Sequence, residues 1–199
     1  VLICGAYGKG NAGDDSILEA ILQQMRAIDP DLPVYVLSRN PKETRLRYRV
    51  GAIHTFDFFG FLRRMGKTKL YLNGGGSLIQ DVTSTRSLQY YLANIALAKK
   101  RGNHVLMYGC GIGPVSAPRN RRAAGQIIDK YVDAITLRES HSAQELSDMG
   151  VTRPAISVTA DPALLLDPAP AEAVEAFLLS QGQVGGQAVL GRQQWAPTP

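Results

Sequence analysis

The sequence predicts an α/β protein in which one parallel sheet carries helices on both faces, the arrangement called doubly wound. Two observations lead to this prediction. Short apolar runs, rich in β-branched or aromatic residues, alternate along the chain with longer amphipathic runs. The short runs also lie next to Gly, Asn or Asp, which are typical of the turns at strand ends. Because strand and helix alternate, right-handed crossovers join parallel strands in a Rossmann-like sheet.

Each expected element has its own pattern. Mostly apolar runs predict buried strands at residues 1–4, 34–37, 69–72, 104–108, 134–137 and 156–158, with a weaker strand at 52–55. Apolar residues that recur every three or four positions predict helices at 14–27, 84–100 and 139–149. Gly150 follows the third of these helices, in a position typical of a helix C-terminus.

The chain is expected to contain one domain and the start of another. Residues 1–168 carry the alternating pattern, and a proline-rich stretch at 161–169 is typical of a linker. Residues 170–180 are expected to form a helix. After Gln181 the composition shifts to Gly and Gln, and residues 188–190 could begin another strand. We therefore interpret residues 169–199 as a linker helix and the truncated start of a second domain.

Composition excludes several classes of protein. The chain is 45% hydrophobic, which is too high for a disordered protein. It has no apolar run long enough to span a membrane, and it opens on a strand-like run rather than a signal peptide. Two distant cysteines and three scattered histidines predict neither a disulfide framework nor a metal site. The net charge of +5 is spread over the chain, so we expect no nucleic-acid partner.

Ligands of open parallel sheets bind at the carboxyl ends of the strands, so the residues that follow each strand are the most informative. Three glycine-rich segments follow predicted strands, at 5–15, 73–81 and 109–114. We interpret them as loops along one edge of the sheet, where glycine permits tight turns or close approach to a ligand.

The first segment contains G-x-G-x-x-G at Gly8, Gly10 and Gly13, a spacing found in dinucleotide-binding domains. No acidic residue ends the second strand to bind a ribose, although Arg39 there could accept a 2′-phosphate. Asp14 and Asp15 at the predicted helix start disfavour a pyrophosphate. The segment suits a ligand with hydroxyl groups, or a phosphate held by Lys9, better than a dinucleotide. Asp14 is either a helix cap or a group that acts on a ligand hydroxyl.

The later segments supply further candidates. Gly75, Gly76 and Ser77 offer backbone N–H groups and a hydroxyl that suit an anion or sugar oxygens. Asp81 either binds hydroxyls or caps the helix that begins near Ser84. His141 is a candidate for proton transfer, but a lone histidine at a helix start is more often a surface residue.

Arg138 ends a buried strand, where a charge needs a partner. It either meets an anionic ligand or pairs with a neighbour such as Glu139 or Asp161.

Together these motifs resemble the polysaccharide pyruvyl transferase family, and most of all its CsaB type. The resemblance covers residues 1–168. It rests on Gly8-Lys-Gly-Asn-Ala-Gly-Asp-Asp15, Asn73-Gly-Gly-Gly-Ser-Leu-Ile-Gln-Asp81, Gly109-Cys-Gly-Ile-Gly-Pro114, Leu137-Arg-Glu-Ser-His-Ser142 and Thr159-Ala-Asp-Pro162. The catalytic candidates are Asp14 and His141. The candidates for substrate binding are Gly10, Asn11, Gly13, Gly75, Gly76, Ser77, Asp81, Gly111, Gly113, Arg138, Glu139, Ser142 and Asp161.

The resemblance implies a fold like a GT-B glycosyltransferase, of which this chain would supply the N-terminal half. It implies transfer of a pyruvyl group from phosphoenolpyruvate to a sugar, without a cofactor or metal. In the CsaB type the acceptor is an N-acetylmannosamine residue on a lipid-linked cell-wall precursor, and the ketal anchors S-layer proteins. A cytoplasmic location at the inner face of the plasma membrane would follow, with peripheral membrane contact. The donor is expected mainly on the second domain, so this chain alone is expected to be inactive.

Three other functions remain open from the residues. A nucleotide-sugar glycosyltransferase of the GT-B type would share the fold but transfer a sugar. An NADP-binding oxidoreductase domain would use the G-x-G-x-x-G segment and Arg39. A fragment that only binds glycan would use the same hydroxyl-binding groups without catalysis.

Overall fold

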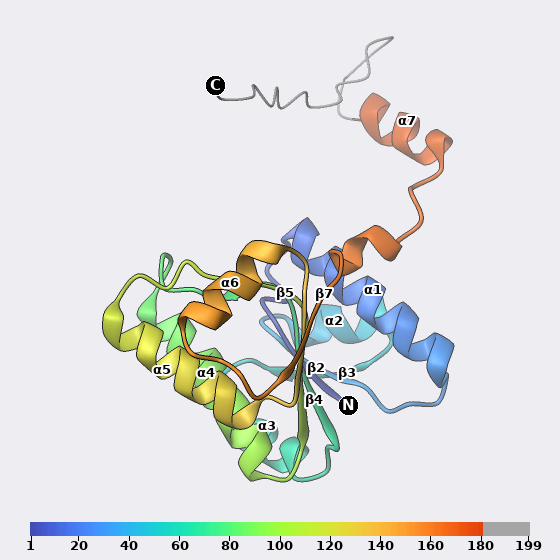
Figure 1. Cartoon of the computed structure of the whole chain (residues 1–199). Coiled ribbons are helices and arrows are strands. Elements are labelled where there is room, and N and C mark those ends of the chain that lie inside the picture. Colours follow the sequence, from blue (N-terminus) through green and yellow to red (C-terminus); the bar gives the residue numbers. More distant parts are fainter. Residues whose placement is uncertain (181–199) are drawn as a thin grey trace, which may run out of the picture. The chain divides into compact units, whose positions relative to one another are not determined.

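The computed structural model describes residues 1–180 and divides the chain into two compact units, Val1–Leu166 and a second unit that starts at Asp167 (Figure 1). The first unit contains a seven-stranded sheet in the order β3-β2-β1-β4-β5-β6-β7, with every neighbouring pair parallel. The strands are β1 (Leu2–Cys4), β2 (Tyr35–Ser38), β3 (Gly51–His54), β4 (Leu70–Ile79), β5 (His104–Ile112), β6 (Ala134–Leu137) and β7 (Ala155–Val158). The doubly wound parallel sheet is confirmed.

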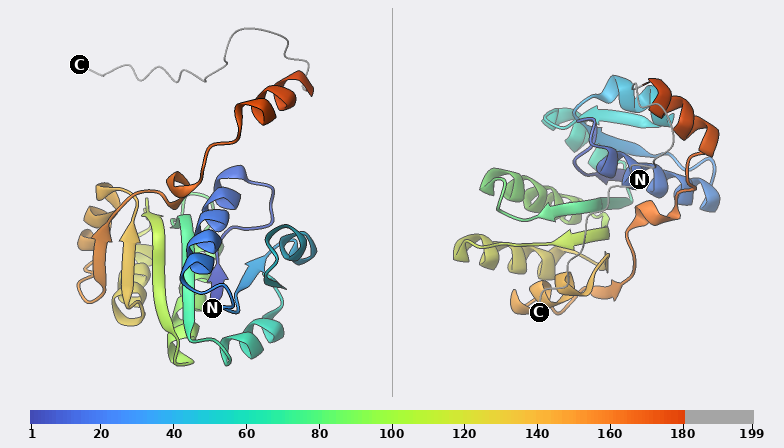
Figure 2. Two further views of the ribbon diagram at one scale, coloured as in Figure 1. Left: turned by 90° about the vertical axis from the view of Figure 1, so that its right-hand side faces the viewer. Right: turned by 90° about the horizontal axis from the view of Figure 1, so that it is seen from above.

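Six helices connect these strands: α1 (Ala12–Ile28), α2 (Pro41–Tyr48), α3 (Phe58–Met65), α4 (Thr85–Lys100), α5 (Pro118–Tyr131) and α6 (Ser140–Asp148). The chain moves outward from β1 to β3, crosses back to β4 beside β1, and then moves outward to β7. Helices α1 and α2 cover one face of the sheet and α3 to α6 cover the other (Figure 2). The direction of winding therefore reverses between β1 and β4, where open α/β sheets bind their ligands.

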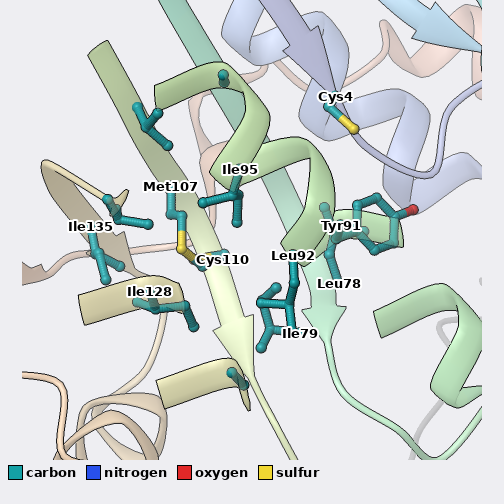
Figure 3. Close-up of a cluster of buried hydrophobic side chains, with 14 of the residues drawn as sticks. Cys4, Leu78, Ile79, Tyr91, Leu92, Ile95, Met107, Cys110, Ile128 and Ile135 are labelled. Atoms are coloured by element: carbon teal, nitrogen blue, oxygen red, sulfur yellow. The ribbon is translucent and has the colours of Figure 1, made fainter. Parts of the chain in front are cut away.

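The core lies on both faces of the sheet because successive side chains of a strand point to opposite sides. Leu2 and Cys4 of β1 pack toward α3 to α6, whereas Ile3 packs toward α1 and α2. Figure 3 shows the larger cluster, in which Ile95 of α4 and Met107 of β5 lie side by side. These strands are apolar almost throughout because both of their faces are buried.

Two of the glycine-rich segments are strands rather than loops. We predicted that the third and fourth clear strands end at residues 72 and 108, but β4 and β5 continue to Ile79 and Ile112. Gly76 pairs with Cys110 and Ile79 with Ile112, with a register shift between these pairs. The prediction was wrong because glycine was taken as a turn signal. Here it permits the positive φ of +62° at Gly75 and +68° at Gly76 within an irregular strand.

Three helices were not predicted, each for a local reason. Helix α2 is mostly polar and has little apolar periodicity, and in α3 the apolar residues are consecutive. Helix α5 begins with Pro118, and proline usually signals a break in a helix. In the first turn, however, proline's missing N–H costs nothing. The weaker strand at 52–55 is confirmed as β3, and Gly150 has the positive φ of +77° expected after α6.

The proline-rich stretch is only partly a linker. Pro162–Leu165 form a short 3₁₀ helix, η1, that packs against α1, and Pro162 is buried. In the second unit, helix α7 spans Ala171–Ser180. The strand expected at 188–190 lies outside the described residues. Within residues 1–180, no helix is both long enough and apolar enough to cross a membrane.

Candidate functional site

Arg138 is the centre of a polar cluster at the carboxyl ends of β4, β5 and β6. Its guanidinium donates to Asp161 Oδ2 at 2.9 Å, to Glu139 Oε2 at 3.2 Å and to Ser77 Oγ at 3.2 Å. Both carboxylates that the sequence offered as partners therefore bind Arg138 together. The ion pairs compensate the cost of placing a cation at the end of a buried strand.

The other members of the cluster are held in place by the backbone. Ser142 is buried at the start of α6, accepts from the Ile112 N–H at 2.7 Å and donates to Glu139 Oε1. Asp161 also accepts from the Ala163 N–H at 3.0 Å, which caps η1. The carboxylates beside Arg138 are therefore fixed by β5, α6 and η1 as well as by Arg138 itself.

Glycines leave space for this cluster. A Cβ atom on Gly111 would lie 2.8 Å from Ser77 Oγ and 3.1 Å from Glu139 Oε1. A Cβ atom on Gly76 would lie 3.2 Å from Asp14 Oδ1. Gly76 thus brings the first turn of α1 next to β4, which places Asp14 at the same edge as Ser77 and Arg138. Ser77 itself is exposed, so a ligand can reach it.

Asp14 is the third residue of α1 and is half-buried. The helix cap is Asn11, whose side chain accepts from the Gly13 N–H at 2.9 Å and the Asp14 N–H at 3.3 Å. The interpretation of Asp14 as the cap was therefore wrong, because the helix begins two residues earlier than its apolar pattern. Burial raises the pKa of Asp14, while the charge of Lys9 opposes that rise. A half-buried carboxylate with a raised pKa suits proton transfer.

Asp81 has a structural role that neither sequence interpretation described. Its carboxylate accepts from the N–H groups of Ser116 and Ala117 at 2.8 and 3.0 Å, and from Asn120 Nδ2 at 2.8 Å. These hydrogen bonds lower its pKa. Asp81 therefore fixes the segment that leads into α5 and the side chain of Asn120 in its first turn. Helix α4, which Asp81 was expected to cap, is capped by Ser84.

The remaining candidates lie outside the cluster. His141 is exposed in the first turn of α6 and forms no hydrogen bond or ion pair with another described residue. Gly10 and Asn11 belong to the β1–α1 connection, Gly13 lies in the first turn of α1, and Gly113 lies near the side chain of Glu145. Within residues 1–180, no three His, Cys, Asp or Glu side chains converge as metal ligands.

Sequence reasoning missed a cavity at the same edge, which we call the cationic cavity. It has a volume of about 320 Å³ and lies among the ends of β1, β2 and β3 and the first turns of α4. Its lining includes Lys9, Arg39, Arg86, Phe56, Tyr90 and Tyr91. Lys9 and Arg39 were noticed singly. Tyr90 and Tyr91 were also considered as residues that could line a cleft, although core positions were favoured for them. Arg86 and Phe56 were not noticed, because they come from distant parts of the chain that only the fold brings together.

Fold and cluster together define a Rossmann-like domain that carries polar groups at the carboxyl edge of its sheet, next to the reversal point. Fold alone does not specify the reaction of such a domain.

A model of the polysaccharide pyruvyl transferase family matches residues 11–192, so the chain belongs to this family. The match extends beyond residue 168, where we expected the resemblance to end. Neither the curated proteins nor the solved structures yielded a match. The chain is therefore assigned to a family of transferases that add pyruvyl groups to polysaccharides.

Proposed function

We propose that the complete protein transfers the pyruvyl group of phosphoenolpyruvate to a sugar of a lipid-linked cell-wall precursor. The observation that carries this proposal is the half-buried carboxylate of Asp14 beside Gly76, at the edge where Ser77 and Arg138 also lie. The acceptor would be N-acetylmannosamine, as in the CsaB type, and the ketal would anchor S-layer proteins. The enzyme would act at the cytoplasmic face of the membrane, where such precursors are made.

The reaction joins two sugar hydroxyls to one carbon. The methylene carbon of phosphoenolpyruvate accepts a proton, which leaves a cation-like carbon that the first hydroxyl attacks. The second hydroxyl then displaces phosphate at the same carbon and closes a cyclic ketal. Each hydroxyl loses one proton, so the reaction needs a base at the acceptor and an acid at the methylene carbon.

The described residues suit the acceptor side of this reaction. Asp14 would take the proton of the attacking hydroxyl, since burial keeps its carboxylate more basic than usual. Ser77, Gly75 and Gly76 would hold sugar oxygens from β4. Arg138 is neutralised by two carboxylates, so it would hold the side chains of the site in place rather than bind an anionic substrate. His141 remains the second candidate for proton transfer because its exposed imidazole can donate or accept a proton.

The test is to supply the complete protein with phosphoenolpyruvate and an N-acetylmannosamine glycolipid. We expect a pyruvylated glycolipid by mass spectrometry and one phosphate released for each ketal formed. Phosphate release without a ketal would contradict the proposal. Consumption of a nucleotide sugar instead, with a longer glycan as product, would identify a glycosyltransferase.

A further inference from the structure

The cationic cavity is a preformed space rather than a gap between loops. The Arg39 N–H donates to Tyr7 O at 3.0 Å, which joins the segments after β2 and β1. The Thr55 N–H donates to Ser38 O at 3.0 Å, and the Tyr90 hydroxyl donates to Thr55 O at 3.3 Å. These bonds tie three loops and α4 together, so the walls of the cavity do not depend on a ligand.

The charged side chains that line this cavity are all positive. Lys9, Arg39 and Arg86 reach it from three different elements, and no carboxylate is among its lining residues. The side chains of Lys9 and Arg86 form no hydrogen bond or salt bridge within residues 1–180, and Arg39 lies 4.6 Å from the centroid of Phe56. Arg138, in contrast, is bound by two carboxylates. The cavity therefore retains positive charge that suits a phosphate or diphosphate.

The rest of the lining is mostly apolar, and a second cavity lies next to it. That cavity, of about 220 Å³, shares Thr55, Phe56 and Tyr90 with the first and adds Phe58, Phe61 and Asn94. At its outer side Phe58 is 59% and Phe59 82% exposed, although both are large apolar residues. A ligand with charged groups in the cationic cavity would therefore find apolar side chains next to it, from Phe56 to Phe58.

We propose that the cationic cavity binds the diphosphate of an amphiphilic ligand, and that the first apolar segment of its lipid chain lies along Phe56 and Phe58. This inference rests on the proposed function and deepens it, because it places the lipid end of the acceptor between α3 and α4. The sugar end would then extend toward Asp14, which lies close enough to Lys9 for the lysine's charge to influence its pKa. The ligand class is a prenyl or similar lipid diphosphate, and a soluble phosphate ester would use only the charged half of the site.

The experiment is calorimetric titration of the 199-residue chain with farnesyl diphosphate, inorganic diphosphate and phosphoenolpyruvate. Farnesyl diphosphate should bind at least about tenfold more tightly than inorganic diphosphate, because a few methylene groups leave water on binding. Equal affinity for the two diphosphates would overturn the proposal of an amphiphilic ligand and indicate a site for free phosphate. Tighter binding of phosphoenolpyruvate would overturn it as well.

Variants separate the two halves of the site. Arg39→Gln and Arg86→Gln should each weaken the binding of both diphosphates about fivefold. This is the scale of one partly exposed charge contact. Phe58→Ala should weaken the binding of farnesyl diphosphate but not that of inorganic diphosphate. Arg101→Gln is the matched control, because Arg101 is exposed at the other end of α4. If Arg101→Gln weakens binding as much as Arg86→Gln, the effect is general charge attraction and the proposal fails.

Binding and turnover can fail separately. Farnesyl diphosphate binding without ketal formation by the complete protein would contradict the proposed function and leave the cavity assignment standing. Ketal formation without farnesyl diphosphate binding would overturn the cavity assignment alone. In an active enzyme, Arg86→Gln should raise KM for the lipid-linked acceptor but not for a short water-soluble acceptor.

Discussion

At the scale of single residues, two aspartates at one edge of the sheet acquire opposite chemistry from their surroundings. Burial raises the pKa of Asp14, whereas three hydrogen bonds lower that of Asp81. Both follow glycine-rich segments, so the sequence makes them look alike. Their environments assign Asp14 to proton transfer and Asp81 to the support of α5.

Asp14→Asn in the complete enzyme should lower kcat by about a hundredfold or more, the usual contribution of a positioned base. Since the folded pKa is raised, the ionised carboxylate costs stability above the pKa of the unfolded chain. The free energy of unfolding at pH 7 should therefore be unchanged or slightly higher in the variant. Steady-state kinetics at saturating donor and urea unfolding would measure the two effects.

The control for Asp14 is its neighbour Asp15, which forms an ion pair with Arg47 at 3.1 Å. Asp15→Asn removes a carboxylate from the same helical turn and should leave kcat within a few-fold of wild type. If Asp14→Asn also stays within a few-fold, Asp14 is not the base.

Asp81→Ala should destabilise the protein by about 1 kcal/mol, the typical net contribution of an intramolecular hydrogen bond. Because the folded pKa is lowered, this stabilisation is present above the unfolded pKa and is lost as pH falls through the folded pKa. The difference in the free energy of unfolding between Asp81→Ala and wild type should therefore become smaller at acidic pH. Unfolding curves at several pH values would show it. A normal unfolding midpoint with a raised acceptor KM would instead identify Asp81 as a ligand.

At the scale of elements, β4 and β5 are the feature that shapes the site. They have 10 and 9 residues, whereas β1 has 3 and β6 has 4. Their extra length carries Gly76, Ser77 and Gly111 past the ends of their neighbours. Side chains from α1 and from the segment after β6 converge on this extension, so the cluster depends on the long strands.

Gly75→Ala should destabilise the protein by about 2–4 kcal/mol, because a positive φ and a steric clash act together. Its Cβ atom would lie 2.1 Å from Cγ2 of Ile17 in α1. Gly102 is the matched control, since it has a φ of +82° but nothing within 4 Å of its Cβ position. Gly102→Ala should cost about 1 kcal/mol. Equal losses in urea unfolding would mean that backbone strain alone, not packing against α1, requires glycine at residue 75.

The sequence predicted elements well where a local pattern determines them. Strands β1 and β2 were predicted because both of their faces are buried, and α4 because its apolar residues follow one face. The extension of β4 could not be predicted, since Gly75 and Gly76 are equally compatible with a turn. The hydrogen bonds of Asp81 to α5 and the cationic cavity also went unseen, because they join residues that are distant in the chain.

At the scale of the whole molecule, the described residues supply one Rossmann-like sheet. The resemblance implies two such domains around a cleft, with the donor mainly on the second. The cluster on this sheet has carboxylates and hydroxyls, and its one arginine is already paired. The cluster around Arg138 therefore suits sugar hydroxyls better than an anion, and the positive charge available at this edge lies in the cationic cavity.

If the donor site lies on a second domain, as the resemblance implies, the 199-residue chain should bind acceptor but transfer pyruvate at least about a thousandfold more slowly than a two-domain protein that holds both substrates. Ketal formation and acceptor binding, measured side by side for both proteins, test this expectation. Comparable turnover by the two would show that the donor site lies within these residues.

The glycines of β4 have a consequence for how the family could diversify. Near the register shift after Gly76, the pairing of β4 with β5 is irregular, and any substitution except proline leaves the backbone N–H and C=O groups in place. Mutation acts instead on the side chains at either flank, such as Asp14 on α1 and Glu139 after β6. A library that varies only those flanks would explore new acceptor sugars while the strand between them keeps the same chemical surface.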